Sequence, residues 1–202
     1  MSTRAKDLQR ARQSEWDRQE RRRRLLIIGG WGAAALLFVA MIVYLVWKQV
    51  QPIPKTGEAV PIQGTSHIPV GQPHEPYNSN PPTSGPHYAQ PAEAGFYDEA
   101  PPDENLVHSL EHGYVIIWYN CNALTDSQCS QLKSRIRDVM ASAGNSLLTN
   151  TPKLIAVPRT NMETQLALTT WGRLDKFDAF DRQRILDFIK VFRDNAPENK
   201  VP

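Results

Sequence analysis

A run of 23 residues without a charged side chain is the feature that most constrains what this chain can fold into. It extends from Leu25 to Trp47 and reads LLIIGGWGAAALLFVAMIVYLVW. A helix rises about 1.5 Å per residue, so this run is long enough to cross a hydrocarbon core of about 30 Å. A helix on a soluble domain would carry a polar stripe, which is missing here. The sequence therefore predicts a transmembrane helix over residues 25–47.

The flanks of this run indicate that it stays in place as a signal-anchor. A cleavable signal peptide has a shorter apolar region of about 7–15 residues, followed by small residues at the cleavage site. Here the run continues into KQVQP at residues 48–52, which contains no such site. Tyr44 and Trp47 also stand where aromatic side chains meet the membrane interface.

The distribution of charge predicts the orientation of the anchor. Residues 1–24 contain nine basic and four acidic side chains, a net charge of +5, whereas residues 25–202 carry −3. Basic flanks remain in the cytoplasm, so we expect a cytoplasmic N-terminal tail and an extracytoplasmic remainder in a single-pass protein of the cell membrane. Because the basic tail adjoins the anchor, we expect it to meet the lipid bilayer and not nucleic acid.

The distribution of proline and aromatic residues divides the chain after residue 47 into a linker and a domain. Twelve of the 16 prolines lie between Pro52 and Pro102, and we interpret residues 48–65 as a proline-rich linker. Residues 66–105 also contain aromatic side chains, which disordered linkers rarely have, so we expect an ordered but irregular wrap over a core. The predicted extracytoplasmic domain covers residues 66–197.

Hydrophobic patterns after residue 105 predict a small α+β domain. Thr125 and Gln128 form a capping box for one helix, and Asp178 is the predicted cap of the last helix. Residues 158–164 suit a hairpin between the second and third strands. The predicted elements, in order, are a strand over 114–119, a helix over 126–142, strands over 153–157 and 165–171, and a helix over 179–194.

Cys121 and Cys129 are the only cysteines, and they lie between the first strand and the following helix. Outside the membrane a disulfide is permitted, so we expect them to staple this connection. Thioredoxin-like proteins carry reactive cysteines at a similar place, and Thr151-Pro152 before a strand resembles the latter half of that fold. Their cysteines are separated by two residues, whereas seven intervene here. A thiol–disulfide oxidoreductase is therefore the less favoured interpretation.

Two longer segments resemble a known family. One is NPPTSGPH at residues 80–87 and the other is VHSLEHG at residues 107–113, directly before the first strand. Together they resemble a family of bacterial, single-pass, membrane-anchored proteins of unknown function that have PPTSGPH and HSLEHG motifs. The resemblance covers most of residues 60–195. It implies a membrane helix followed by an extracytoplasmic domain, and it implies no particular activity.

The histidines of these segments suggest a metal site. His108 and His112 are four residues apart and share one face of a helical turn, so both imidazoles can bind one cation. His87 is the predicted third ligand, and Glu111 is the predicted supporting carboxylate. Three imidazoles suit copper or zinc. The remaining histidines, His67 and His74, are spare candidates.

Other interpretations of the same residues remain open. The histidines can instead bond loop backbone in a non-enzymatic structural or protein-interaction module with a partner in the cell envelope. The pattern H-x-x-E-H at residues 108–112 also occurs in metallopeptidases, but Gly113 and a strand follow at once, so the sustained helix is missing. A hydrolase built from Ser84 or Ser109 with Asp103 lacks the G-x-S-x-G sequence. We therefore expect a metal-binding module without catalytic activity.

Overall fold

The computed structural model describes residues 23, 26, 30–31, 36–45 and 56–202. The chain divides into two compact units, residues 1–52 and 53–202. In the first unit, residues 36–45 are helical and exposed. Among the described residues, no helix combines the length and apolar character needed to cross a membrane. Parts of the predicted anchor, the predicted tail apart from Arg23, and the linker up to residue 55 lie outside the described residues.

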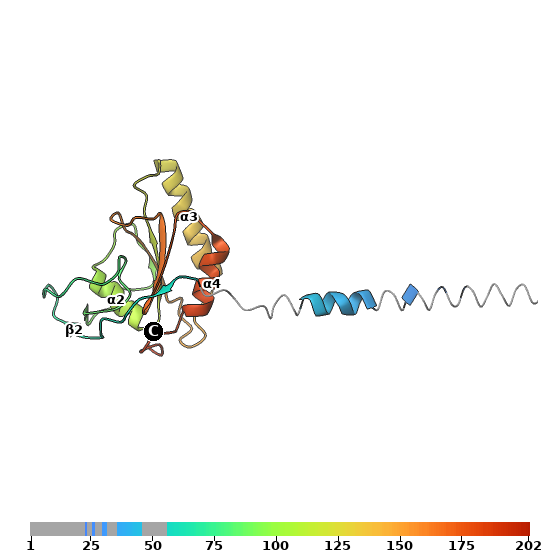
Figure 1. Ribbon diagram of the computed structural model, residues 1–202, viewed down its shortest axis with the longest axis horizontal. Helices are drawn as coiled ribbons and strands as arrows, with labels where there is room; N and C mark the ends of the chain where they lie inside the picture. Colours follow the sequence, from blue (N-terminus) through green and yellow to red (C-terminus); the bar gives the residue numbers. More distant parts are fainter. Residues whose placement is uncertain (1–22, 24–25, 27–29, 32–35, 46–55) are drawn as a thin grey trace, which may run out of the picture. The chain divides into compact units, whose positions relative to one another are not determined.

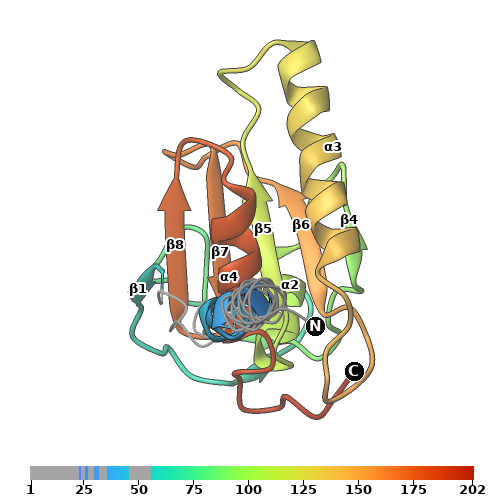
Figure 2. The same ribbon diagram turned by 90° about the vertical axis from the view of Figure 1, so that its right-hand side faces the viewer.

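A mixed six-stranded sheet forms the centre of the second unit (Figures 1 and 2). β6 pairs in parallel with both β5 and β4, and the other neighbouring strands are antiparallel. Across the sheet, the order is β1 (Glu58–Ala59), β8 (Arg173–Phe177), β7 (Leu166–Thr170), β5 (Val115–Tyr119), β6 (Leu154–Pro158) and β4 (Gly95–Phe96). The predicted α+β class is confirmed.

Helices cover both faces of this sheet. The helices α3 (Asp126–Ser142) and α4 (Arg182–Phe192) lie on one face, and α2 (Asp103–Glu111) lies on the other (Figure 2). Successive side chains of a strand point to opposite faces, which divides β5 between two clusters. Ile117 packs in the cluster with α3 and α4, whereas Ile116 packs in the cluster with α2.

The proline-rich stretch before α2 is ordered and irregular. Its two short strands, β2 (His67–Ile68) and β3 (His87–Tyr88), pair in parallel, and β3 lies against α2. Thr83 and Ser84 in the connecting loop are fully buried. This arrangement brings β2, β3 and the second half of α2 together, although they are far apart in the sequence.

Two helix predictions have different outcomes. The helix over 126–142 is confirmed, and its capping box between Thr125 and Gln128 is present. The last helix begins later than predicted, because Asp181 and not Asp178 caps it by accepting from the backbone N–H of Arg184 at 3.0 Å. Asp178 instead accepts from the backbone N–H of Gln165.

The predicted hairpin over residues 158–164 is wrong. β6 lies beside β5 as a parallel strand, because α3 crosses over between them, and it does not pair with β7. The hairpin lies one connection later, between β7 and β8. Gly172 occupies this turn with a φ of 67°, a left-handed conformation that favours glycine.

The helix α2 was not predicted as a regular element. Two prolines precede it, and Asp103 and Glu104 occupy its first turn, where carboxylates interact favourably with the helix dipole. Arg159 forms a bidentate pair with Asp103, with distances of 2.7 and 3.0 Å. The sequence therefore contains the signals of a helix start, namely prolines followed by carboxylates. They precede a short apolar stripe in which Leu106 and Leu110 are buried.

Candidate metal centre

Four histidine rings gather at the junction of β2, β3 and α2. The ring centroid of His87 lies 4.7 Å from that of His67 and 4.9 Å from that of His108. The rings of His67 and His108 are 4.9 Å apart, and His112 contacts His108 edge-on at 4.5 Å. His74 lies apart from them, beside Glu104 at 3.2 Å. Of the five histidines, four therefore belong to one cluster.

Backbone carbonyls fix the orientation of the two central rings. Nδ1 of His87 lies 2.8 Å from the carbonyl oxygen of Gly85, and Nδ1 of His108 lies 2.7 Å from that of Tyr88. A carbonyl oxygen can only accept, so both Nδ1 atoms carry the hydrogen in these bonds. In the neutral rings Nε2 then keeps the lone pair. Metal-binding histidines commonly have this arrangement.

Glycines make these contacts possible. Gly85 has a φ of 130°, and a Cβ atom there would meet the ring of Tyr77 at 2.9 Å. Gly113, which follows His112, has a φ of 87°, and a Cβ atom there would lie 2.8 Å from the Cα atom of Asp194. The glycines of the two sequence motifs therefore allow backbone turns and close approaches that other residues would obstruct.

Glu111 places a buried carboxylate next to this cluster. Its Oε2 atom lies 2.9 Å from Nε2 of His87, and the two side chains are 3% and 0% exposed. The two atoms are close enough for an ion pair, and neither makes a hydrogen bond within the described residues. Buried polar atoms are normally hydrogen-bonded, so these two atoms call for a shared cation or for a proton between them.

Burial keeps His108 neutral. Desolvation is the largest influence on this ring and lowers its pKa to about 4, against the opposing effect of the bond to Tyr88. The neighbouring rings of His112, His87 and His67 lower the pKa further. At neutral pH the imidazole of His108 is therefore uncharged, which is the form that binds a metal.

Two sets of side chains have the spacing of a metal site. The first, here called the His67 group, comprises His67, His87, His108 and Glu111. The second, called the Glu198 group, comprises His108, His112 and Glu198. In each group every residue offers one ligand atom, and these atoms all lie within 4.8 Å of one another.

The structure distributes the sequence-predicted ligands over both groups. His87, His108 and Glu111 come together in the first group, and His112 lies in the second. The spare candidate His67 completes the first group, whereas His74 lies apart. Glu198 was not predicted, since nothing in its local sequence relates it to the histidines. Metal binding by His87, His108, His112 and Glu111, and the identity of the metal, stay predictions.

The residues considered for hydrolysis are engaged elsewhere. The hydroxyl of Ser109 donates to the carbonyl oxygens of Ala92 and Asn105, and the carboxylate of Asp103 pairs with Arg159. Ser84 accepts from the backbone N–H of Gln63. These contacts give each group a structural role.

The cysteines form the predicted disulfide. Cys121 and Cys129 are bonded, with their Cα atoms 5.5 Å apart, and they join the end of β5 to the first turn of α3. The chain has no free cysteine. The disulfide is a covalent staple on this connection.

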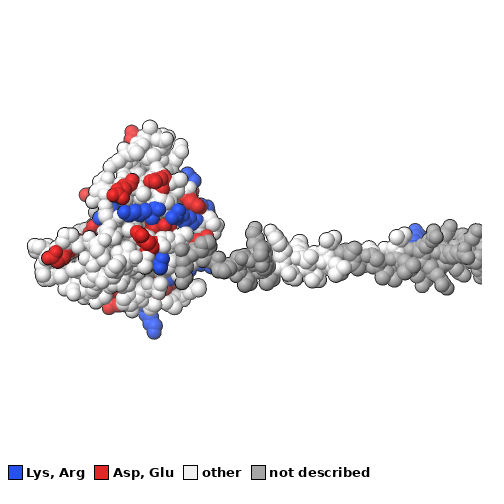
Figure 3. All heavy atoms as spheres, viewed as in Figure 1, with Lys and Arg blue, Asp and Glu red and all other residues white. Residues whose placement is uncertain are grey.

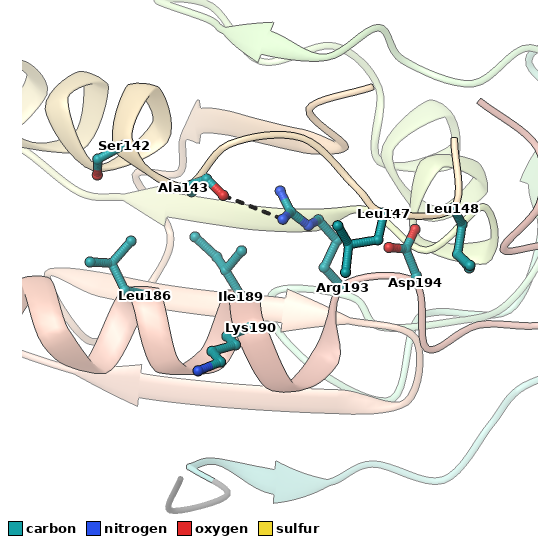
Figure 4. A pocket seen from close by; sticks show the side chains of 9 residues that line it. All are labelled: Ser142, Ala143, Leu147, Leu148, Leu186, Ile189, Lys190, Arg193 and Asp194. Atoms are coloured by element: carbon teal, nitrogen blue, oxygen red, sulfur yellow. Dashed lines mark hydrogen bonds between the residues drawn. The ribbon is translucent and has the colours of Figure 1, made fainter. Parts of the chain in front are cut away.

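A separate groove of about 460 Å³ lies between the end of α3 and the side of α4 (Figure 4). Arg193 in this groove donates to the carbonyl oxygens of four residues, including Ala143, and Asp194 pairs with Lys153. Arg193 and Asp194 thus hold neighbouring loops in place. Elsewhere, basic and acidic side chains interleave on the face of the domain that is shown in Figure 3.

The family described as "Protein of unknown function (DUF3105)" matches residues 67–202, about two thirds of the chain. No curated protein and no solved structure matches the chain. The chain therefore belongs to the DUF3105 family.

Proposed function

We propose that this DUF3105 domain binds a copper or zinc cation through His67, His87, His108 and Glu111. The observation that carries the proposal is the pair of buried imidazoles oriented by backbone carbonyls, with Nε2 of His87 beside a buried Glu111 oxygen that makes no hydrogen bond. Buried polar atoms without a hydrogen bond cost stability, so their presence supports a ligand at this place.

The donor set supports this choice of metals. Three imidazoles and one carboxylate are ligands that zinc and copper accept. In a tetrahedral zinc site with bonds of about 2.0–2.1 Å, the ligand atoms lie about 3.3 Å apart. The atoms of the His67 group are all within 4.8 Å of one another, so small side-chain rotations bring them to this spacing. The cation would be held by the domain as a binding module, without catalysis.

The rival explanation is a buried ion pair. If His87 were protonated, its charge would be compensated by Glu111 alone, and the cluster would be a structural network. The two explanations differ in whether a cation is retained, which makes the proposal testable.

Metal retention by the full-length chain in detergent tests the proposal. After incubation with Zn²⁺ or Cu²⁺ and exhaustive dialysis, we expect one equivalent of metal in the wild type. Glu111→Gln keeps the shape of the side chain and should weaken binding more than about tenfold, whereas His87→Ala should abolish it. His74→Ala is the matched control and should bind as the wild type does. A wild-type chain with no retained metal and no thermal shift would refute metal binding.

We also propose that residues 25–47 anchor this domain in the cell membrane, with residues 1–24 in the cytoplasm. The uncharged run, the basic tail and the disulfide, which persists in oxidising compartments, support this topology. Labelling of single cysteines introduced at either flank, in intact cells, tests it. A label that reaches the N-terminal tail and not the domain would contradict the orientation.

The finer fold prediction, a partly thioredoxin-like core, has topological support. β5, α3 and β6 form a parallel crossover, and the antiparallel pair β7–β8, one connection later than the predicted hairpin, leads into α4. Both cysteines lie at the start of this crossover, but they are bonded to each other across seven residues. We therefore propose the likeness for the fold and not for redox chemistry.

A further inference from the structure

The Glu198 group lies directly beside the proposed site. Nε2 of His112 is 3.4 Å from Oε2 of Glu198. Nδ1 of the same ring is buried and has no hydrogen-bond partner within the described residues. A ring nitrogen without a hydrogen bond is unusual on a histidine that is only 6% exposed. No hydrogen bond therefore occupies this nitrogen of His112, and it is available to bind a ligand.

His108 belongs to both groups, but it has one coordinating atom. Its Nδ1 atom donates to the carbonyl oxygen of Tyr88 at 2.7 Å, which leaves Nε2 as the only lone pair of the neutral ring. A single lone pair binds one cation at a time. The two groups are therefore alternative positions for one cation and not a site for two.

A buried lysine side chain holds the segment that carries Glu198 beside the end of α2. Lys153, which is fully buried, donates from Nζ to the carbonyl oxygens of His112 at 2.8 Å and Asn199 at 2.7 Å. The backbone N–H of Glu198 also donates to the carbonyl oxygen of Glu111 at 3.0 Å. These bonds fix the C-terminal segment beside the histidines, so the position of Glu198 is a built feature of the fold.

The exposed members lie at the two ends of the cluster. His67 is exposed in the first group, and the side chain of Glu198 is 48% exposed in the second. The members between them are buried: His87, His108, Glu111 and His112. Each group thus combines a buried ligand set with one ligand that faces solvent.

We infer that the domain passes its cation from the His67 group to the Glu198 group by ligand exchange at His108. This inference rests on the proposed metal-binding function and adds a second position and a direction to it. The direction follows from the number of ligands, which is four in the His67 group and three in the Glu198 group. The bonds to His67, His87 and Glu111 break as bonds to His112 and Glu198 form, while the bond to His108 persists. The cation keeps its oxidation state, and the domain acts as a carrier that releases its cargo beside the C-terminal segment.

The rate of metal release from the full-length chain in detergent tests this inference. The chain is loaded with one equivalent of Zn²⁺ and mixed with an excess of a chromogenic chelator, and release is followed by absorbance. We expect Glu198→Gln and His112→Asn to slow release about tenfold or more, while the equilibrium affinity stays within about threefold. His74→Asn is the matched control and should release as the wild type does. Thermal unfolding of each variant confirms that it is folded.

Several results would overturn the inference. Unchanged release rates in Glu198→Gln and His112→Asn would show that the second position is not used, while the binding by the His67 group would still stand. Two tightly held Zn²⁺ equivalents in the wild type would show that the groups are independent sites. A wild type that holds no cation would refute both the inference and the function on which it rests.

Discussion

The two faces of the sheet bury different chemistry. The face under α3 and α4 buries an apolar cluster that includes Ile136, Phe188 and Ile189. Its buried polar side chains Thr170 and Asp175 both have partners on α4. The face under α2 also has an apolar cluster, but buried polar side chains adjoin it: Thr83, Ser84, His87, His108, Ser109, Glu111 and His112. Burial of polar groups costs free energy unless they are paired. The comparison indicates that the first face supports folding, whereas the second combines folding with the proposed metal site.

Truncation of Phe188 on the apolar face should have the largest effect on stability. This side chain is fully buried, so Phe188→Ala should lower the free energy of unfolding by about 3–5 kcal/mol. Zn²⁺ affinity of the folded protein should not change, because α4 contributes no ligand. Urea unfolding and metal titration measure the two quantities.

The counterpart on the other face is Leu106→Ala in α2, where the side chain is also fully buried. It should lower stability by about 2–5 kcal/mol and also weaken metal binding, because α2 positions His108 and Glu111. Equal effects of the two variants on Zn²⁺ affinity would break the comparison between the faces.

Removal of the disulfide should have a smaller effect. A closed loop with a sequence separation of eight residues is expected to contribute about 2–3 kcal/mol through the entropy of the unfolded chain. The double variant Cys121→Ser/Cys129→Ser should unfold at correspondingly lower urea concentration and retain its Zn²⁺ affinity. Loss of metal binding in a folded double variant would show that the staple supports the α2 face as well.

The last effect arises only on acidification and concerns the pH dependence of the stability of the metal-free protein. Because burial lowers the pKa of His108 to about 4 in the folded state, the unfolded chain binds this proton first as the pH falls below about 6.5. The contribution of neutral His108 to stability is therefore complete above pH 6.5 and is lost progressively towards pH 4.

Urea unfolding in a chelator between pH 7 and pH 4 measures this effect. His108→Gln should flatten the decline in stability, whereas His74→Gln should leave it unchanged. If stability declined by the same amount in His108→Gln as in the wild type, this ring would not titrate as its burial indicates. The α2 face would then be more accessible to solvent than the face under α3 and α4.

Local patterns predicted several elements well. The helix α3 follows from its apolar stripe and from Thr125 and Gln128, and β5 follows from a run of β-branched and aromatic residues. The disulfide follows from the chain having two cysteines that flank a short connection. These features depend on neighbours in the sequence, so the sequence contains their signals.

Pairing between distant segments was harder to predict. β6 was expected to form a hairpin with the next strand, but the crossover through α3 places it beside β5. The signals for α2 were short, since this helix has nine residues and little apolar surface of its own. Its stability comes from packing against β3 and the sheet, which local propensity does not reveal.

The sequence by itself determined the charge division of the chain, the α+β class and the confinement of all histidines to residues 67–112. It also brought His87, His108, His112 and Glu111 forward as one candidate set. Only the tertiary structure decided that His67 joins them, that His112 turns to Glu198, and that carbonyls of Gly85 and Tyr88 orient the rings. The physical reason is that a binding site requires positions in space, and chain segments separated by loops acquire those positions only when the whole domain packs.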